Sequence, residues 1–178
     1  GTEDLNTRET LRTELNVFAE FSPVLSPELR KKPHIFLANI DPELQLDVLR
    51  QMDTRPALVA LDTMNFWIEG RKSALTSIVE AVDVLFVDEG EARSLSGEVN
   101  LRSAARSIMD LGPSAIVIKR GGNGVLLFNG DSIFAAPAFP LDSVVDPTGA
   151  GDSFAGGFMG YLAATGDLSE AGFRRAAI

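Results

Sequence analysis

The chain has 178 residues, enough for one sizeable α/β domain but too few for two full domains. With 45% hydrophobic and 23% charged residues it can form a globular core. A formal net charge of -9 would repel a nucleic acid, no apolar run reaches the ~18 residues of a membrane helix, and the lack of cysteine excludes disulfides and thiolate metal sites. We therefore expect a cytoplasmic protein that binds neither nucleic acid nor membrane.

Hydrophobic periodicity predicts strands that alternate with helices. Residues 11–17 have the pattern of a half-buried strand, and the apolar run at 34–40 is typical of a strand buried on both faces. Further strands are predicted at 57–62, 83–88, 115–119, 124–128 and 133–136, and helices near 42–52, 71–81 and 101–111. This order implies parallel strands with helices on both faces, and Asn129-Gly130 predicts a hairpin that closes one edge.

Polar residues that directly follow the predicted strands are the first candidates for a binding site. Ligands of open parallel sheets bind outside the carboxyl ends of the strands. Asp62, Asp88, Lys119 and Arg120 all occupy such positions. We therefore expect these four side chains to lie near one another.

The sharpest motif is the Gly-rich run Asp146-Pro147-Thr148-Gly149-Ala150-Gly151-Asp152, which opens a long apolar helix. Its glycines allow successive backbone amides to point together at a helix N-terminus, which is favourable for a phosphoryl group. Asp152, in the same first turn, could accept the proton of an attacking hydroxyl. The alternative is an ordinary helix cap with no catalytic role.

The longer run from Val145 to Phe158 resembles the C-terminal signature of the PfkB, or ribokinase-like, carbohydrate kinases. The similarity covers nearly the whole chain, beginning at the lid-like segment 4–8. It implies a ribokinase-like three-layer α/β/α fold with a mostly parallel sheet, incomplete at its N-terminus, plus part of a small β lid. We expect a partial lid at 1–22 and the incomplete nucleotide-binding and catalytic domain at 23–178.

The resemblance also assigns roles within the Gly-rich run. It implies that Asp152 is the catalytic base and that the amides of Gly149, Ala150 and Gly151 form the anion hole for the transferred phosphate.

Two cation sites are implied by the same resemblance. Asp88 and Glu91 match the element that places Mg²⁺ through water, although Asp88 stands where the family has Asn. The alternative is that Asp88 only caps the helix that carries Glu91. Asp146 and Thr148 correspond to a monovalent cation site, with K⁺ as the candidate ion, although Asp146 could instead only pin the loop.

On the nucleotide side, the resemblance assigns Lys119, Arg120, Gly121 and Gly124 to ATP binding. Arg120 is the preferred phosphate ligand of the basic pair because its planar fork matches phosphate oxygens, whereas Lys119 could equally be a solvated turn residue. Asn65 follows a central strand and is a candidate substrate ligand.

Three further side chains are expected to be structural. Phe66 and Trp67 have the character of core aromatics, and His34 precedes a strand. One histidine and no cysteine cannot readily form a catalytic zinc site or a histidine-based triad, which disfavours a hydrolase.

We therefore predict an ATP-dependent phosphotransferase that phosphorylates an alcohol group of a sugar or nucleoside. The alternative is a non-catalytic nucleotide- or sugar-binding module or an inactive fragment of such a kinase; a dehydrogenase is a more distant alternative. Because the chain starts at Gly1 and ends within the helical pattern 173–178, we expect both ends to be cut and the isolated segment to be poorly stable or inactive. The 11–17 strand could pair across a two-fold axis in a homodimer.

Overall fold

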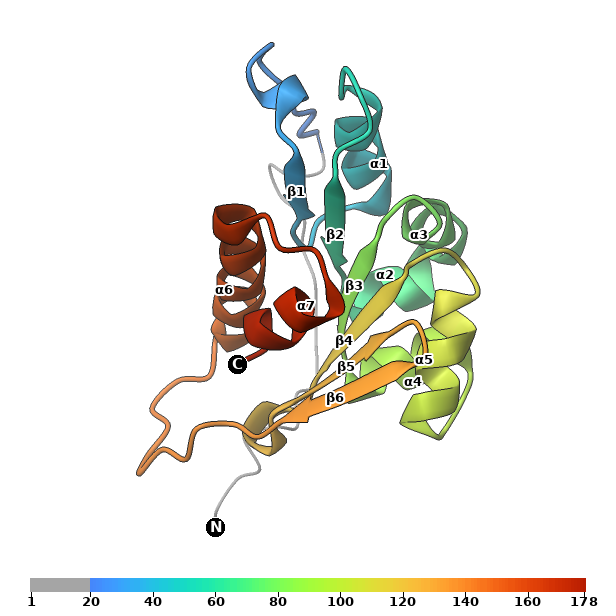
Figure 1. The fold of residues 1–178 in the computed structure, drawn as a ribbon. Helices are drawn as coiled ribbons and strands as arrows, with labels where there is room; N and C mark the ends of the chain where they lie inside the picture. Colours follow the sequence, from blue (N-terminus) through green and yellow to red (C-terminus); the bar gives the residue numbers. More distant parts are fainter. Residues whose placement is uncertain (1–19) are drawn as a thin grey trace.

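The computed structural model describes residues 20–178, so the predicted 11–17 strand and nearly all of the predicted 1–22 lid lie outside the described residues. A six-stranded sheet in the order β1-β2-β3-β4-β5-β6 runs through the structure (Figure 1). Its strands are β1 (His34–Leu37), β2 (Leu58–Asp62), β3 (Val84–Asp88), β4 (Ala115–Lys119), β5 (Val125–Asn129) and β6 (Ser132–Ala136).

Four of these strands are parallel and the last two are antiparallel. β1 to β4 pair in parallel, β4 pairs with β5 antiparallel, and β5 and β6 form a hairpin at the edge of the sheet. This confirms the predicted mostly parallel sheet. The hairpin differs in one detail: Asn129 pairs with Ser132, so the two loop residues are Gly130, at φ +54°, and Asp131 rather than Asn129 and Gly130.

Helices cover both faces of the sheet, as predicted (Figure 1). On one face lie α1 (Pro42–Arg50), α2 (Asn65–Gly70), α3 (Lys72–Val79), α4 (Glu89–Ser96) and α5 (Leu101–Met109), and on the other lie α6 (Ala150–Thr165) and α7 (Glu170–Ala176). Short 3₁₀ turns occur at Leu29–Lys31 and Gly121–Asn123. None of the helices among residues 20–178 is long and apolar enough to cross a membrane.

The core on the α6 face is built around Phe86, in the middle of the sheet. Its ring packs edge-on against Phe36 of β1 and against Phe154 and Phe158 of α6, with centroids 5.8, 6.4 and 5.3 Å away. Phe158 in turn contacts Phe173 of α7. These contacts fix the position of α6, and therefore of its first turn, over the ends of the strands.

Two expectations about apolar residues were wrong. β1 is not buried on both faces: it lies at the sheet edge, and of its four residues only Leu37 is buried. Phe66 is 39% exposed, whereas Trp67 is buried as predicted. These two residues lie in the first turn of the short helix α2, which turns their side chains to different sides and which the sequence pattern did not reveal.

Candidate active site

The last residue of each of the strands β2, β3 and β4 is polar. Side chains alternate between the two faces of a strand, and Ala60, Phe86 and Val117 belong to the core on the α6 side. Two positions further along each strand come Asp62, Asp88 and Lys119. Lys119 and its partner Asp62 lie on the α6 face of the sheet, whereas the carboxylate of Asp88 bonds the first turn of α4.

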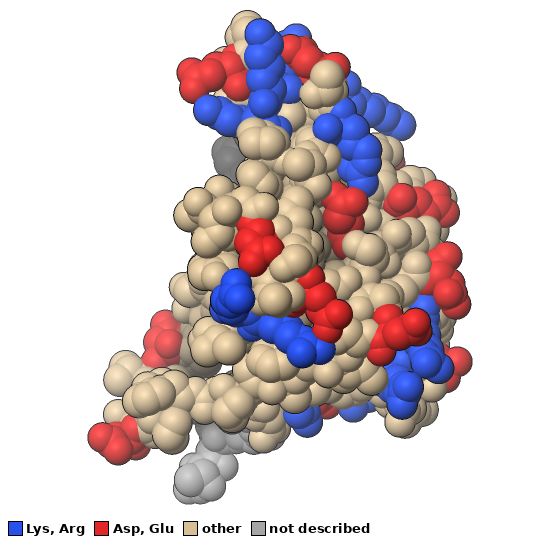
Figure 2. All heavy atoms as spheres, in the orientation of Figure 1, with Lys and Arg blue, Asp and Glu red and all other residues tan. Residues whose placement is uncertain are grey.

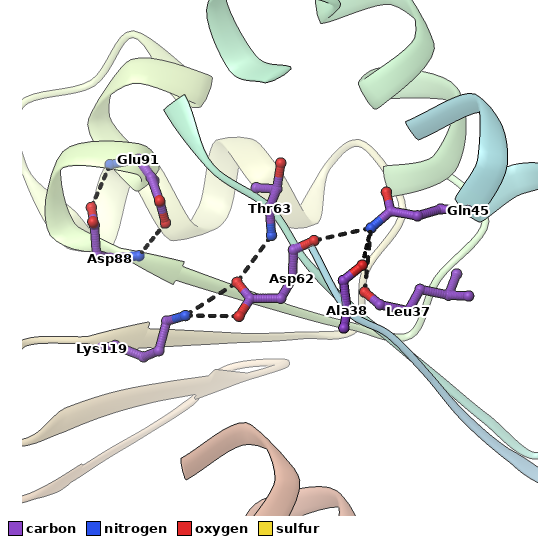
Figure 3. Close-up of polar contacts among 8 residues, drawn as sticks. All are labelled: Leu37, Ala38, Gln45, Asp62, Thr63, Asp88, Glu91 and Lys119. Carbon is purple, nitrogen blue, oxygen red and sulfur yellow. Dashed lines mark hydrogen bonds and ion pairs between the residues drawn. The ribbon is translucent and has the colours of Figure 1, made fainter. Parts of the chain in front are cut away.

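Lys119 and Asp62 form an ion pair across the intervening strand β3 (Figure 3). Lys119 Nζ donates to Asp62 Oδ2 at 2.9 Å and to Oδ1 at 3.1 Å. Asp62 Oδ1 also accepts the amide N–H of Thr63. Burial raises the pKa of Asp62, and Lys119 opposes that rise. The ammonium group of Lys119 therefore favours the ionised form of the Asp62 carboxyl group.

The first turn of α6 lies directly against this ion pair. A β-carbon placed on Gly151 would be 3.3 Å from Lys119 Nζ, so the ammonium group rests on the Gly151 backbone. Asp152, the predicted base, follows Gly151 in this turn, and its charge helps to raise the pKa of Asp62. The side chain of Asp152 is exposed. The structure thus brings Asp62, Lys119, Gly151 and Asp152 together.

The Gly-rich loop before α6 has two internal hydrogen bonds. Asp146 Oδ1 accepts the amide of Thr148 at 2.8 Å, which is the loop-pinning contact that the sequence analysis left as the alternative to a K⁺ site. The amide of Ala150 donates to the Pro147 carbonyl, so in this structure that amide already has a partner. Gly149 adopts φ +78°, a conformation that favours glycine and turns the chain into the helix.

Upstream of this turn, the loop projects from the domain (Figure 1) and carries few charged side chains on the face shown in Figure 2. Its exposed apolar side chains are Phe139, Leu141, Val144 and Val145.

Asp88 and Glu91 form a reciprocal capping box at the start of α4 (Figure 3). Asp88 Oδ1 accepts the Glu91 amide and Glu91 Oε2 accepts the Asp88 amide, each at 2.7 Å. The cap that the sequence analysis gave as the alternative is therefore present. Burial, together with the nearby charges of Asp88 and Asp62, raises the pKa of Glu91 to about 7. Glu91 will bind a proton readily unless a cation lies nearby.

These carboxylates fit Mg²⁺ only through water. Carboxylate oxygens are suitable ligands for Mg²⁺, which usually retains several of its waters. However, one oxygen of Asp88 and one of Glu91 already accept a backbone amide. Within residues 20–178, no three His, Asp or Glu side chains are grouped closely enough to hold a metal ion directly. The donor set is therefore compatible with a hydrated ion and not with a preformed cage.

Arg120 is directed away from the Lys119 and Asp62 pair. Its Nε donates to Glu89 Oε1 at 2.6 Å, and this contact lowers the pKa of Glu89. The predicted glycines follow: Gly121 adopts φ +54°, and Gly124, at φ +84°, passes so close to the Ala136 carbonyl that a β-carbon there would be 2.0 Å from its oxygen. The fold therefore requires glycine at position 124, whether or not a nucleotide binds there.

Asn65 begins α2 three residues beyond Asp62, and it is exposed. The neighbouring Trp67 Nε1 donates to Asn39 Oδ1 at 2.9 Å, which ties α2 to the residue two positions after β1. Sequence reasoning did not single out Asn39, although its position just after a strand is the signal that identified the other candidates.

Gln45 of α1 was also missed. It is 2% exposed, and its Nε2 donates to the carbonyls of Leu37, Ala38 and Asp62. A polar residue within an amphipathic helix gives no signal that it is buried, so no sequence pattern marks Gln45.

With this geometry in place, comparison with known proteins identifies the family. The family model described as pfkB family carbohydrate kinase matches residues 32–177, and the chain belongs to this family. The cytidine kinase of Thermococcus kodakarensis is 35% identical over 153 residues, which make up 83% of this chain and 55% of that kinase. The family resemblance read from the sequence is thereby confirmed.

Solved structures agree with the fold. Aminoimidazole riboside kinase from Salmonella enterica, complexed with aminoimidazole riboside and an ATP analog, is 25% identical, with a TM-score of 0.70 over 83% of this chain and 53% of that one. Fructokinase from Vibrio cholerae O395, in a form with fructose, ADP and calcium, gives a TM-score of 0.72 at 20% identity, over 90% of this chain and 54% of that one. The chain thus spans about half the length of these relatives.

Proposed function

We propose that this chain carries the catalytic end of an ATP-dependent kinase that phosphorylates an alcohol group of a sugar or a nucleoside. One observation carries the proposal: the exposed carboxylate of Asp152 lies in the first turn of α6, next to Gly151 and to the Lys119 and Asp62 pair at the strand ends. A base, a glycine-lined helix N-terminus and an ammonium group converge there. Phosphoryl transfer needs this combination because its catalysis is mainly positioning and charge stabilisation.

In the proposed mechanism, Asp152 accepts the proton of the acceptor hydroxyl as the hydroxyl oxygen attacks the terminal phosphorus of ATP. The bond between that phosphorus and the β,γ-bridging oxygen breaks, and ADP leaves. The backbone amides of Gly149 and Gly151 donate to the oxygens of the transferred group, and the positive end of the α6 dipole favours the same charge. Ala150 joins them once its amide leaves the Pro147 carbonyl. Gly121 and Gly124 line the nucleotide side.

Cations complete the proposed site. Asp88 and Glu91 would hold Mg²⁺ through water, and the ion would supply neutralisation of the phosphate charge. Asp146 and Thr148 would hold K⁺ beside the Gly-rich loop, where the Asp146 contact to the Thr148 amide already shapes the turn.

The acceptor class follows from the relatives. The similar proteins named above act on a nucleoside, a riboside and a sugar, as their names state. Asn65 and Asn39 are the first asparagines after β2 and β1, and amide side chains both donate to and accept from hydroxyl groups. We assign Asn65 to acceptor binding.

The test is ADP formation by the intact gene product that contains residues 1–178, measured with a panel of sugars and nucleosides. Asp152→Asn is expected to lower the rate by about 10²–10⁴-fold. The matched control is Asp142→Asn, in the exposed loop before α6, which should retain full activity. If the Asp152→Asn variant transfers phosphate at the wild-type rate, the assignment of Asp152 as the catalytic base is wrong.

A second outcome would support a different function. If the protein binds ATP but transfers phosphate to no member of the panel, the chain is a nucleotide-binding module. The observation that leaves this candidate open is that the alignment covers 55% of the cytidine kinase, so the similarity extends over only part of that enzyme.

A further inference from the structure

The strand ends contain more negative than positive charge. Asp62 and Glu91 are buried there, Asp88 is bonded to Glu91, and Asp152 lies beside Asp62. The cation paired within this group is Lys119. Arg120, one residue further, pairs with Glu89 instead. A phosphate group that approaches these strand ends therefore depends on Lys119 for a positive side chain.

Lys119 occupies an electrostatically unusual place. It rests on Gly151 at the N-terminus of α6, where the helix dipole is positive and an ammonium group is disfavoured. Asp62 compensates for this, because both of its carboxylate oxygens contact Nζ. Together, the ammonium and the amides of the first turn form a concentration of donors that suits a multiply charged anion.

Lys119 and Asp62 differ in how accessible their side chains are to a ligand. The side chain of Asp62 is 4% exposed and that of Lys119 is 20% exposed, so a ligand can reach the lysine but not the aspartate. An ammonium group has three donors, and Asp62 occupies at most two of them. Lys119 can thus contact an incoming phosphate while Asp62 still holds it.

We propose that Lys119 binds the terminal phosphate of ATP at the first turn of α6, and that Asp62 is the positioning residue that holds Lys119 there. This inference rests on the proposed kinase function. It assigns the phosphate contact to Lys119 rather than to Arg120, and it gives Asp62 a role through its partner rather than through substrate. A side chain at position 151 would crowd the ammonium group, because its β-carbon would lie 3.3 Å from Lys119 Nζ.

The experiment is a double-mutant cycle in the intact gene product. Dissociation constants for ATP and ADP, each with Mg²⁺, are measured by calorimetry for wild type, Lys119→Met, Asp62→Asn and the double variant. Lys119→Met is expected to weaken ATP binding by about 10-fold or more and ADP binding by less than about 3-fold. Asp62→Asn should weaken ATP binding less than Lys119→Met, and the double variant should match Lys119→Met because Asp62 acts through the lysine.

Controls separate this role from a structural one. Lys72→Met, on the exposed side of α3, should leave both dissociation constants unchanged. Urea unfolding of each variant reports its stability: a purely structural pair would lose stability with no selective effect on ATP. The inference would be overturned if the fold-losses in ATP affinity of the two single variants multiplied in the double variant. It would also be overturned if Lys119→Met weakened ATP and ADP binding equally. Absence of ATP binding by the wild type would instead overturn the proposed function.

A measurement on the folded wild type tests the same contact even if the Lys119 or Asp62 variants fail to fold. With ¹⁵N-labelled lysine side chains, ATP should shift one lysine Nζ signal that ADP leaves in place. That signal should be missing from the spectrum of Lys119→Arg. A spectrum in which ATP shifts no lysine signal, although ATP binds, contradicts the assignment.

Discussion

Nε2 of Gln45 donates to the carbonyl oxygen of Asp62 at 3.2 Å, and so joins helix α1 to the end of β2. The same nitrogen donates to the carbonyls of Ala38 at 2.8 Å and Leu37 at 3.4 Å, just beyond and at the end of β1 (Figure 3). One buried amide thus fixes the ends of two neighbouring strands. The position of Asp62 depends on it.

Gln45→Leu should lower the free energy of unfolding by about 2–4 kcal/mol, because it leaves buried carbonyls without a donor. Urea denaturation measures this. The control is Gln51→Leu, whose side chain bonds the half-exposed backbone of Leu25 and Pro23, where water can replace it; its loss should stay below about 1 kcal/mol. Equal losses in both variants would show that burial of Gln45 is not the cause.

Gly124→Ala should destabilise the β5 and β6 hairpin by about 2–4 kcal/mol. Gly124 has φ +84°, and the added methyl group would lie 2.0 Å from the Ala136 carbonyl oxygen. Gly122→Ala is the matched control, since a β-carbon there meets nothing within 4 Å; its stability should stay within about 0.5 kcal/mol of wild type. Thermal unfolding of both variants is the comparison, and a neutral Gly124→Ala would refute the close contact.

Phe158→Ala should cost about 3–5 kcal/mol and loosen α6. Phe158 is 1% exposed and contacts Phe86 of the sheet and Phe173 of α7. Hydrogen exchange should therefore accelerate in α6, including its first turn, more than in β3. Phe139→Ala removes a ring that is 82% exposed and should change stability by less than about 0.5 kcal/mol. Unchanged exchange in α6 would mean that other contacts hold this helix.

The protonation of Glu91 should make stability depend on pH. Its pKa is raised from 4.5 to about 7 in the folded state, mainly by burial. Between these values the folded state holds a proton on Glu91 that the unfolded chain has released, so the contribution of Glu91 to stability is greatest below about pH 4.5 and is lost as pH rises through 7. The loss contributed by Glu91 is on the order of 1–3 kcal/mol.

Glu91→Gln tests this in metal-free buffer. Glutamine retains the capping box but cannot ionise, so the variant should match wild type near pH 4.5 and exceed its stability at pH 8. Glu98→Gln, an exposed position in the loop after α4, is the control and should follow the wild-type curve. Urea titrations at each pH give the curves. A constant difference between Glu91→Gln and wild type at every pH would contradict the raised pKa.

The sheet could be predicted because buried strands and amphipathic helices alternate clearly along this chain. The 115–119 strand was predicted with the bounds of β4, and the strand-end rule selected Asp62 and Lys119, which form an ion pair next to α6. The specific ion pair between Lys119 and Asp62 was not predicted, because it depends on the order of the strands in the sheet. The Lys119 and Asp62 pair spans β3, and no spacing between residues 57 positions apart in the sequence indicates that contact.

The choice between Lys119 and Arg120 as the phosphate ligand also depended on tertiary structure that the sequence pattern does not give. Guanidinium geometry favoured Arg120 as a phosphate ligand. In the folded protein, adjacent residues point to opposite sides, and Arg120 meets Glu89 at the start of α4. Gln45 and the exposure of Phe66 were likewise set by tertiary packing, which overrides local pattern.

The position of α6 and α7 late in the sequence has a consequence during synthesis. Among the described helices these two cover the Phe86 face, and both follow every strand of the sheet. While the ribosome is still adding residues before 150, neither helix is available to cover that face, and its apolar side chains lack these packing partners. The face therefore gains its helical cover in a single late event, when Asp152 and the aromatic side chains that follow it leave the exit tunnel.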